Sequence, residues 1–125
     1  ESVLPHFYLR FLKYYTTGAG AFLAKAHYDQ GGFTLALAES APGLRIGRNN
    51  KNLREVMHTD GHAVFMPGLQ LRFFTSDEFT PAWHDVVQKS DDTYNTQTAR
   101  WAVVFFVDPV EKIKTRWEDR HTPIN

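Results

Sequence analysis

Residues 27–46 read HYDQGGFTLALAESAPGLRI, and this stretch decides the fold of the 125-residue chain. The triplet His27-Tyr28-Asp29 ends a strand candidate at 21–27, and Gly31-Gly32 marks a turn. An apolar run follows at 33–38, and Pro42-Gly43 predicts a tight turn before a short alternating strand. Strand, turn, strand, tight turn and strand in this order are typical of an all-β domain.

The remaining sequence continues the pattern of short strands. The strongest prediction is a run of seven apolar residues at 101–107, which Asp108-Pro109 ends. The polar stretch 90–98 is expected to be a loop, and the charged tail after 109 a solvated helix over a sheet edge. Many short strands with little helix predict one all-β domain, a sandwich or barrel, over 1–125. Further segments are strand candidates at 7–15, 53–57, 63–66 and 83–87, and an undecided strand or helical turn at 69–75.

Composition excludes several classes of function. Fourteen basic residues balance fourteen acidic ones and the signs are interspersed, so we expect neither nucleic acid nor a membrane surface as partner. The absence of cysteine excludes disulfides, zinc–thiolate sites and iron–sulfur clusters. Without a transmembrane run or signal peptide, we expect a soluble, cytoplasmic protein acting on a small molecule or protein side chain. The first residue is Glu rather than Met, which fits a processed form or an excised domain.

His27 and Asp29 are the first residues that suggest metal chemistry. Residues two apart on a strand project from the same face, so this imidazole and carboxylate can reach one ion. Two histidines and one carboxylate suit iron(II) and leave other coordination positions exchangeable. His84 lies inside the strand candidate 83–87 and is the preferred third ligand. A His and an Asp two apart also occur by chance at strand ends, so the triplet alone is weak.

Other histidines compete for the same role. A second triplet, His58-Thr59-Asp60, runs directly into Gly61 and is interpreted as a turn. His62 adjoins the same turn, and His6 and His121 lie near the termini, where a buried ligand is not expected.

Taken together, the motifs resemble the iron(II)/2-oxoglutarate-dependent dioxygenases, in the branch of isopenicillin N synthase and the plant 2-oxoglutarate oxygenases. The likeness extends from about Leu9 to Pro109, with its parts in the family's order. Two family motifs differ in this chain. Lys13 occupies the position of Asn in the Asn-x-Tyr motif at the end of a strand, and Ala102 occupies the position of Ser in the Arg-x-Ser motif. The stretches that carry the resemblance are 9–15, 27–35, 43–46, 65–71, 84–86 and 100–109.

The resemblance implies a double-stranded β-helix, a cupin-like jelly roll, that holds iron(II) through His27, Asp29 and His84. It also implies 2-oxoglutarate as cosubstrate, oxygen as oxidant, and succinate and carbon dioxide as coproducts, with an unidentified small molecule or side chain oxidised. Arg100 would bind the distal carboxylate of 2-oxoglutarate, because guanidinium is a planar, permanently charged fork. Tyr15 would add a hydrogen bond, with core packing as its alternative role. Phe33, Leu35 and Phe106 are candidates for the cavity wall, although plain core packing is the preferred interpretation for these three.

Two other functions remain open at this stage. Ala102 and the missing N-terminal region of the family also suit a degenerate, non-catalytic jelly-roll binding module. An iron oxidase that does not use 2-oxoglutarate would bind the metal but would not need Arg100. The plain alternative for Arg100 is an arginine at the edge of the sheet.

Overall fold

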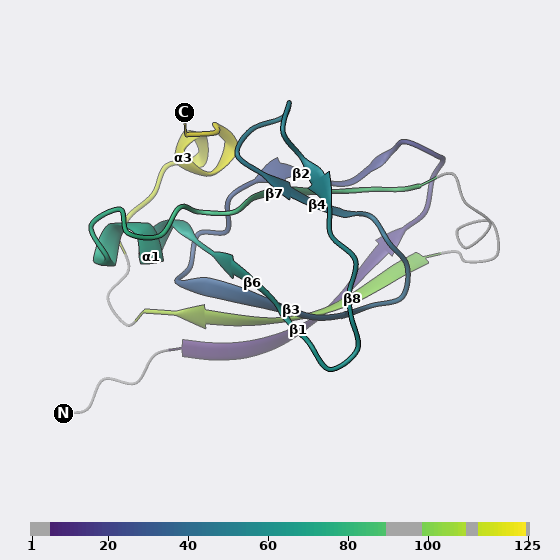
Figure 1. Ribbon diagram of the computed structural model, residues 1–125, viewed down its shortest axis with the longest axis horizontal. Helices are drawn as coiled ribbons and strands as arrows, with labels where there is room; N and C mark the ends of the chain where they lie inside the picture. The colour runs from purple at the N-terminus through teal and green to yellow at the C-terminus, as the bar shows by residue number, and fades with distance from the viewer. Residues whose placement is uncertain (1–5, 90–98, 110–112, 125) are drawn as a thin grey trace.

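Two antiparallel four-stranded sheets form most of the computed structural model, which describes residues 6–89, 99–109 and 113–124 (Figure 1). The chain crosses repeatedly between the sheets, which is the expected all-β, double-stranded β-helix architecture. The first sheet has the order β1 (His6–Tyr15), β8 (Ala99–Asp108), β3 (Phe33–Glu39) and β6 (Val64–Pro67). The second has the order β2 (Phe22–His27), β7 (Trp83–Val87), β4 (Leu44–Gly47) and β5 (Arg54–Glu55).

The two described helices are short and lie at one end of the sheets (Figure 1). Helix α1 (Leu69–Phe74) resolves the undecided segment 69–75 as helix. Helix α3 (Trp117–His121) contacts β2, an edge strand of the second sheet, where a helix over a sheet edge was expected. Neither helix has the length and hydrophobicity needed to cross a membrane.

Most predicted strands are present with small shifts of their ends. The prediction at 53–57 was too long, since only Arg54–Glu55 pairs, with β4. Strand β8 begins at Ala99, two residues before the predicted start. The predicted loop at 90–98 lies outside the described residues.

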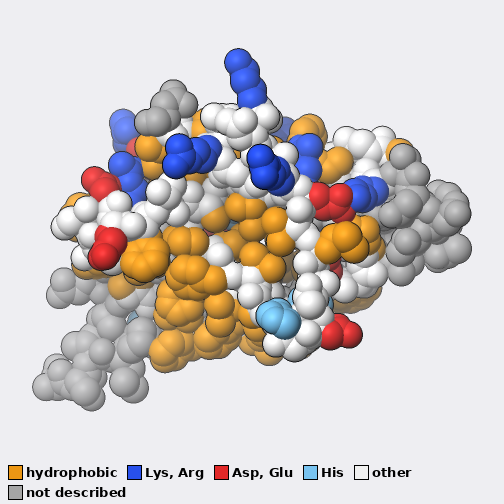
Figure 2. All heavy atoms as spheres, in the orientation of Figure 1, with side chains coloured by type: hydrophobic (Ala, Val, Ile, Leu, Met, Phe, Trp, Pro, Cys, Tyr) orange, Lys and Arg blue, Asp and Glu red, His pale blue; other side chains and the backbone are white. Residues whose placement is uncertain are grey.

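Side chains alternate between the two faces of the first sheet, except at a register shift in β3 between Ala36 and Ala38. On β1, Tyr8, Arg10, Leu12 and Tyr14 line the interior cavity, while the residues between them face outward. The outward face is unusually apolar, and Figure 2 shows hydrophobic side chains gathered along the lower part of the molecule, where Figure 1 places this sheet. Among its exposed members are Phe7, Leu9, Phe11, Phe65 and Trp101.

The same alternation corrects two of the predicted wall residues. Thr34 and Ala36 line the cavity, so Phe33 and Leu35, which alternate with them along β3, face outward. The Phe33 ring lies 5.2 Å from the ring of the half-exposed Phe65, on the outer face. Phe106, the third predicted wall residue, does line the cavity.

The second sheet is anchored by buried side chains on β7. Trp83 is 2% exposed, meets the Tyr28 ring edge-on at 4.9 Å and donates its indole N–H to Asn50. Asp85 is buried and accepts two hydrogen bonds from the Arg45 guanidinium, at 2.8 and 2.6 Å. A bidentate pair satisfies this buried carboxylate and fixes β4 beside β7.

The β6–α1 junction holds the loop that follows β2. The Gly68 N–H donates to the Gly32 carbonyl, and the Leu69 and Gln70 N–H groups donate to the Asp29 and Gly31 carbonyls. A Cβ at Gly68 would lie 2.3 Å from the Gly31 carbonyl oxygen. Glycine at 68 therefore permits the close approach that holds this loop in place.

We predict that Gly68→Ala destabilises the protein by about 1–3 kcal/mol, because two backbone segments must separate to accept the methyl group. The matched control is Gly18→Ala, where a Cβ meets nothing within 4 Å and the change is expected to be near neutral. Urea unfolding followed by circular dichroism measures both variants. Equal midpoints would contradict the proposed contact.

Candidate metal centre and cavity

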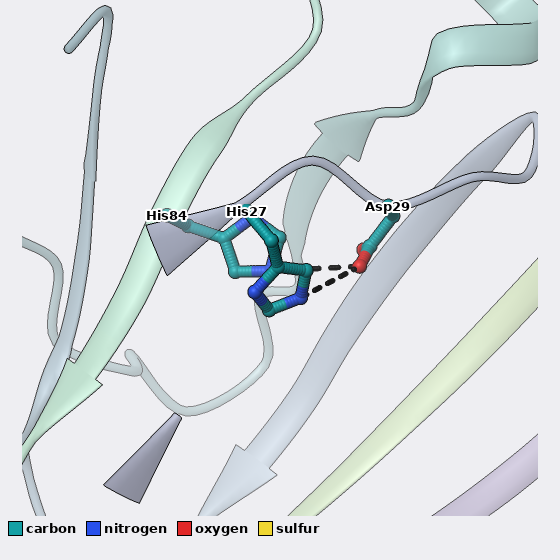
Figure 3. Close-up of side chains that lie close together, drawn as sticks. All are labelled: His27, Asp29 and His84. Atoms are coloured by element: carbon teal, nitrogen blue, oxygen red, sulfur yellow. Dashed lines mark ion pairs between the residues drawn. The ribbon is translucent and has the colours of Figure 1, made fainter. Parts of the chain in front are cut away.

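The pairing of β2 with β7 brings two histidines together. His27 and His84 are cross-strand partners, and their ring centroids are 4.4 Å apart. Asp29 follows β2 by two residues, and its Oδ1 lies 3.5 Å from Nε2 of each histidine (Figure 3). The structure thus brings together the three residues that the sequence selected as metal ligands.

Backbone carbonyls orient both imidazole rings. Nδ1 of His27 lies 2.7 Å from the Lys25 carbonyl, and Nδ1 of His84 lies 2.9 Å from the Ala82 carbonyl. A carbonyl only accepts, so each Nδ1 carries the proton and donates it, which leaves the Nε2 lone pair free in the neutral ring. Both free lone pairs lie on the side of Asp29, an orientation typical of metal-bound histidine.

Asp29 is held by both its side chain and its backbone. The Thr34 hydroxyl donates to Oδ2 at 2.6 Å, which leaves Oδ1 facing the histidines. The Leu69 N–H donates to the Asp29 carbonyl at 3.0 Å. Thr34 is 1% exposed, so its hydroxyl has a fixed direction. Asp29 therefore presents one defined oxygen to the centre.

Electrostatics keep the carboxylate ionised. Burial alone would raise the pKa of Asp29, but the hydrogen bond with His27, the nearby His84 and the Thr34 hydroxyl hold it well below its usual value. Burial lowers the pKa of His84. Burial also opposes protonation of His27, but the hydrogen bonds to Asp29 and the Lys25 carbonyl raise its pKa overall. An ionised carboxylate beside a neutral His84 is the ligand state that a metal requires.

The donor set fits a divalent transition metal. Neighbouring ligand atoms of an octahedral ion with bonds of about 2.0–2.2 Å are about 3 Å apart. The Asp29 oxygen lies 3.5 Å from each Nε2, and all three donor atoms lie within 4.8 Å of one another, so the group contracts when it binds an ion. Two imidazoles and a carboxylate are the ligands of the facial triad that binds iron(II) and leaves positions open. Within the described ranges, His27, Asp29 and His84 form the one group of three potential ligands whose donor atoms converge.

The centre opens into a cavity of about 360 Å³ between the two sheets. Its walls combine an aliphatic part with polar and charged side chains, and this composition and size suit a small organic molecule. Arg100 of β8 lines this cavity and is 3% exposed. Its Nε donates to the Ala41 carbonyl at 2.9 Å, and its Nη2 pairs with Glu39 at 2.6 Å. Arg100 is therefore an interior residue rather than a sheet-edge cap.

The tyrosine beside Arg100 is Tyr14, and the prediction of Tyr15 does not fit the structure. Tyr15 is 68% exposed on the outer face, with its ring 4.9 Å from the Lys13 ammonium. Tyr14 is the register partner of Arg100, lines the cavity, and has its ring 6.0 Å from the guanidinium carbon. A shift of one residue along a strand exchanges the two faces, which explains the error.

The other histidines stand apart from the centre. His58 lines the cavity, but its triplet partner Asp60 has a fully exposed side chain, 3.9 Å from the His58 ring. The Nδ1 of His62 lies 3.1 Å from the Asp60 carbonyl, within the same turn. The His121 ring is 6.4 Å from that of His27 and stacks on Trp117.

Sequence reasoning missed three residues of this region. Thr34 could have been found, since it shares a face with the cavity wall on a predicted strand. Glu39 could not, because a register shift in β3 between Ala36 and Ala38 turns it inward. Arg120 of α3 also lines the cavity, although it belongs to the tail interpreted as solvated.

Comparison with known proteins agrees with this geometry. Residues 7–109 match the family model of the 2OG-Fe(II) oxygenase superfamily. No curated protein sequence matches the chain. Because the family model covers most of the chain, the match establishes the family.

Solved structures with the same fold are distant in sequence. A full-length Neurospora crassa protein in complex with alpha-KG is 22% identical, with a TM-score of 0.67 over 90% of this chain and 42% of that one. AtDAO1, the dioxygenase for auxin oxidation 1 from Arabidopsis thaliana, in its 2-oxoglutarate complex, is 17% identical, with a TM-score of 0.70 over 89% and 42%. JOX2 in complex with 2OG, Fe and JA is 23% identical, with a TM-score of 0.59 over 71% and 25%. The chain thus spans less than half the length of these proteins.

We predict that His27→Ala and His84→Ala each abolish tight iron(II) binding, because each removes one of three ligands. His58→Ala is the matched control, since His58 lines the same cavity and lies outside the converging group. Anaerobic isothermal titration calorimetry with iron(II) measures all three. Loss of binding in the His58 variant, with retention in the His27 variant, would overturn the assignment.

We also predict that Thr34→Val weakens iron(II) affinity by about 10–100-fold, because Asp29 loses the hydrogen bond that directs Oδ1 to the metal. Thr59→Val, at an exposed turn position, is the control and should bind iron normally. The same titration gives both affinities. An unchanged affinity in Thr34→Val would show that the backbone alone orients Asp29.

Proposed function

This chain belongs to the 2OG-Fe(II) oxygenase superfamily, and we propose that it is an iron(II)- and 2-oxoglutarate-dependent oxygenase of a small organic molecule. In this proposal His27, Asp29 and His84 hold the iron. Arg100, with Tyr14, binds the distal carboxylate of 2-oxoglutarate, and succinate and carbon dioxide are the coproducts.

One observation carries the proposal: Nε2 of His27 and Nε2 of His84 each lie 3.5 Å from the same oxygen of Asp29. The carbonyl acceptors at Lys25 and Ala82 fix both rings, and Thr34 fixes the carboxylate. Such orientation costs conformational freedom, and a purely structural ion pair would not need both rings to face one point. The arrangement lies at a cavity of the size that small molecules occupy.

Iron with 2-oxoglutarate, once bound, supplies the oxidising chemistry that amino-acid side chains lack. The chain's own residues bind and orient the reactants. Arg100 offers a fixed guanidinium at a buried position, where a charge-assisted hydrogen bond is strong. Tyr14 lies beside it with a phenol whose pKa is raised by burial, so the hydroxyl stays protonated and can donate. The aliphatic walls exclude water around the substrate's C–H bond.

The direct test is anaerobic titration of the protein with iron(II) and then 2-oxoglutarate. A chelate at the metal gives a weak visible charge-transfer band, and this band is the expected result. His84→Ala should abolish the band, whereas His58→Ala should retain it. Iron binding without any band would reject the use of 2-oxoglutarate.

A second candidate has an observation of its own. Arg100 already pairs with Glu39, and Ala102 offers no hydroxyl to a carboxylate at this position. Both features favour an iron-dependent oxidase that does not take 2-oxoglutarate. Such an enzyme would bind iron, show no chelate band, and lose no activity in an Arg100 variant.

We predict that Glu39→Gln raises 2-oxoglutarate affinity roughly tenfold, because the amide keeps a hydrogen-bond acceptor but no longer neutralises Arg100. Adding Arg100→Ala to Glu39→Gln should remove this gain while sparing iron, without leaving a buried carboxylate unpaired. Glu55→Gln, which breaks the surface pair with Lys89, is the control. The chelate band measures each affinity, and no change in Glu39→Gln would show that Glu39 does not compete with the cosubstrate.

A further inference from the structure

Arg120 is fixed to the residue between two candidate ligands. Its backbone carbonyl accepts the Tyr28 N–H at 2.7 Å, and its Nε donates to the Tyr28 carbonyl at 3.3 Å. The Tyr28 hydroxyl accepts the N–H of Ile124 at 2.7 Å, which holds the residues after α3 as well. Figure 1 shows α3 beside the end of β2, the strand that ends at His27. Arg120 is therefore held at the rim of the centre.

The Arg120 side chain belongs to the cavity. It lines the same 360 Å³ space as His27, Asp29 and His84. Its Nε is used by Tyr28, while its two Nη groups pair with no acid in the described part of the chain. The nearest acid along the helix, Asp119, pairs with Arg116. Arg120 thus offers two Nη amino groups, with four N–H donors, and a full charge to this space.

The acidic groups of the cavity already have partners. Asp29 faces the two histidines, Glu39 pairs with Arg100, and Asp108 accepts the Tyr8 hydroxyl at 2.5 Å. An arginine at a cavity wall without an acid is costly to desolvate unless an anion joins it. A carboxylate is the natural partner, because guanidinium binds it through two parallel hydrogen bonds.

We propose that Arg120 binds the carboxylate of the substrate to be oxidised, which makes the substrate a small organic acid. This inference rests on the proposed oxygenase function and names the substrate class of that site. Leu44, Val56, Val64 and Val86 form an apolar part of the wall, which suits the hydrocarbon body of such an acid. In this proposal Arg120, on α3, orients the substrate toward the metal centre. Arg100 lines the same cavity from β8 and is left for the cosubstrate.

The test compares acids with their neutral amides on the full chain. The probes are phenylacetate with phenylacetamide, and 4-phenylbutyrate with 4-phenylbutyramide, titrated calorimetrically with and without iron(II) and 2-oxoglutarate. We expect the wild-type protein to prefer the acid by about tenfold or more, as a charge-assisted hydrogen bond implies. Arg120→Gln should abolish the preference, and titration of the same variant with iron(II) reports separately on the metal centre. Arg116→Gln, at the solvent-exposed N-cap of the same helix, should retain it.

The outcomes are separable. A wild-type protein without acid preference in either pair, or an Arg120→Gln variant that retains it, overturns the inference. An Arg120→Gln variant that weakens 2-oxoglutarate binding but keeps the acid preference assigns Arg120 to the cosubstrate and also overturns it. Failure of the chelate band to form rejects the proposed function, whereas the acid-to-amide ratio of the metal-free protein still reports on Arg120 itself.

Discussion

The register between β2 and β7 is the constraint on which the centre depends. It places His27 directly opposite His84, so two ligands come from neighbouring strands and their imidazole rings lie close together. The pairing of β2 with β7 is irregular just before His27. Its register shifts between Phe22 and Ala24 and again between Ala24 and His27. The rest of the site adds to this pair: the loop after β2 brings Asp29, and the β6–α1 junction holds that loop.

The strands that carry the two histidines were predictable from the sequence, because they have clear ends, and the order of motifs indicated the jelly roll. Asp29 does join them, but not for the predicted reason: it lies two residues beyond the end of β2, so the two-residue period of a strand does not place it. The choice between Tyr14 and Tyr15 was not predictable in this way. Alternation identifies a buried face only when the other face is polar, and β1 carries Phe7, Leu9 and Phe11 on its outer side.

Glu39 shows a second limit of sequence reasoning. The register shift in β3 turns Glu39 into the interior, where it pairs with Arg100. No local sequence pattern indicates a bulge of this kind. Arg120 shows a third limit of sequence reasoning. Its segment is charged along its length, and its position at the cavity depends on a contact with Tyr28, 92 positions earlier in the chain. Both residues are positioned by tertiary contacts, which a single sequence does not display.

Tyr28 connects the metal centre to helix α3 and to the residues that follow it. It stands between two ligand residues, yet its backbone N–H, carbonyl and hydroxyl are all engaged by Arg120 and Ile124. A rearrangement of the residues from Arg120 to Ile124 would therefore be transmitted to the segment between His27 and Asp29, so the position of α3 and the spacing of two ligands are coupled.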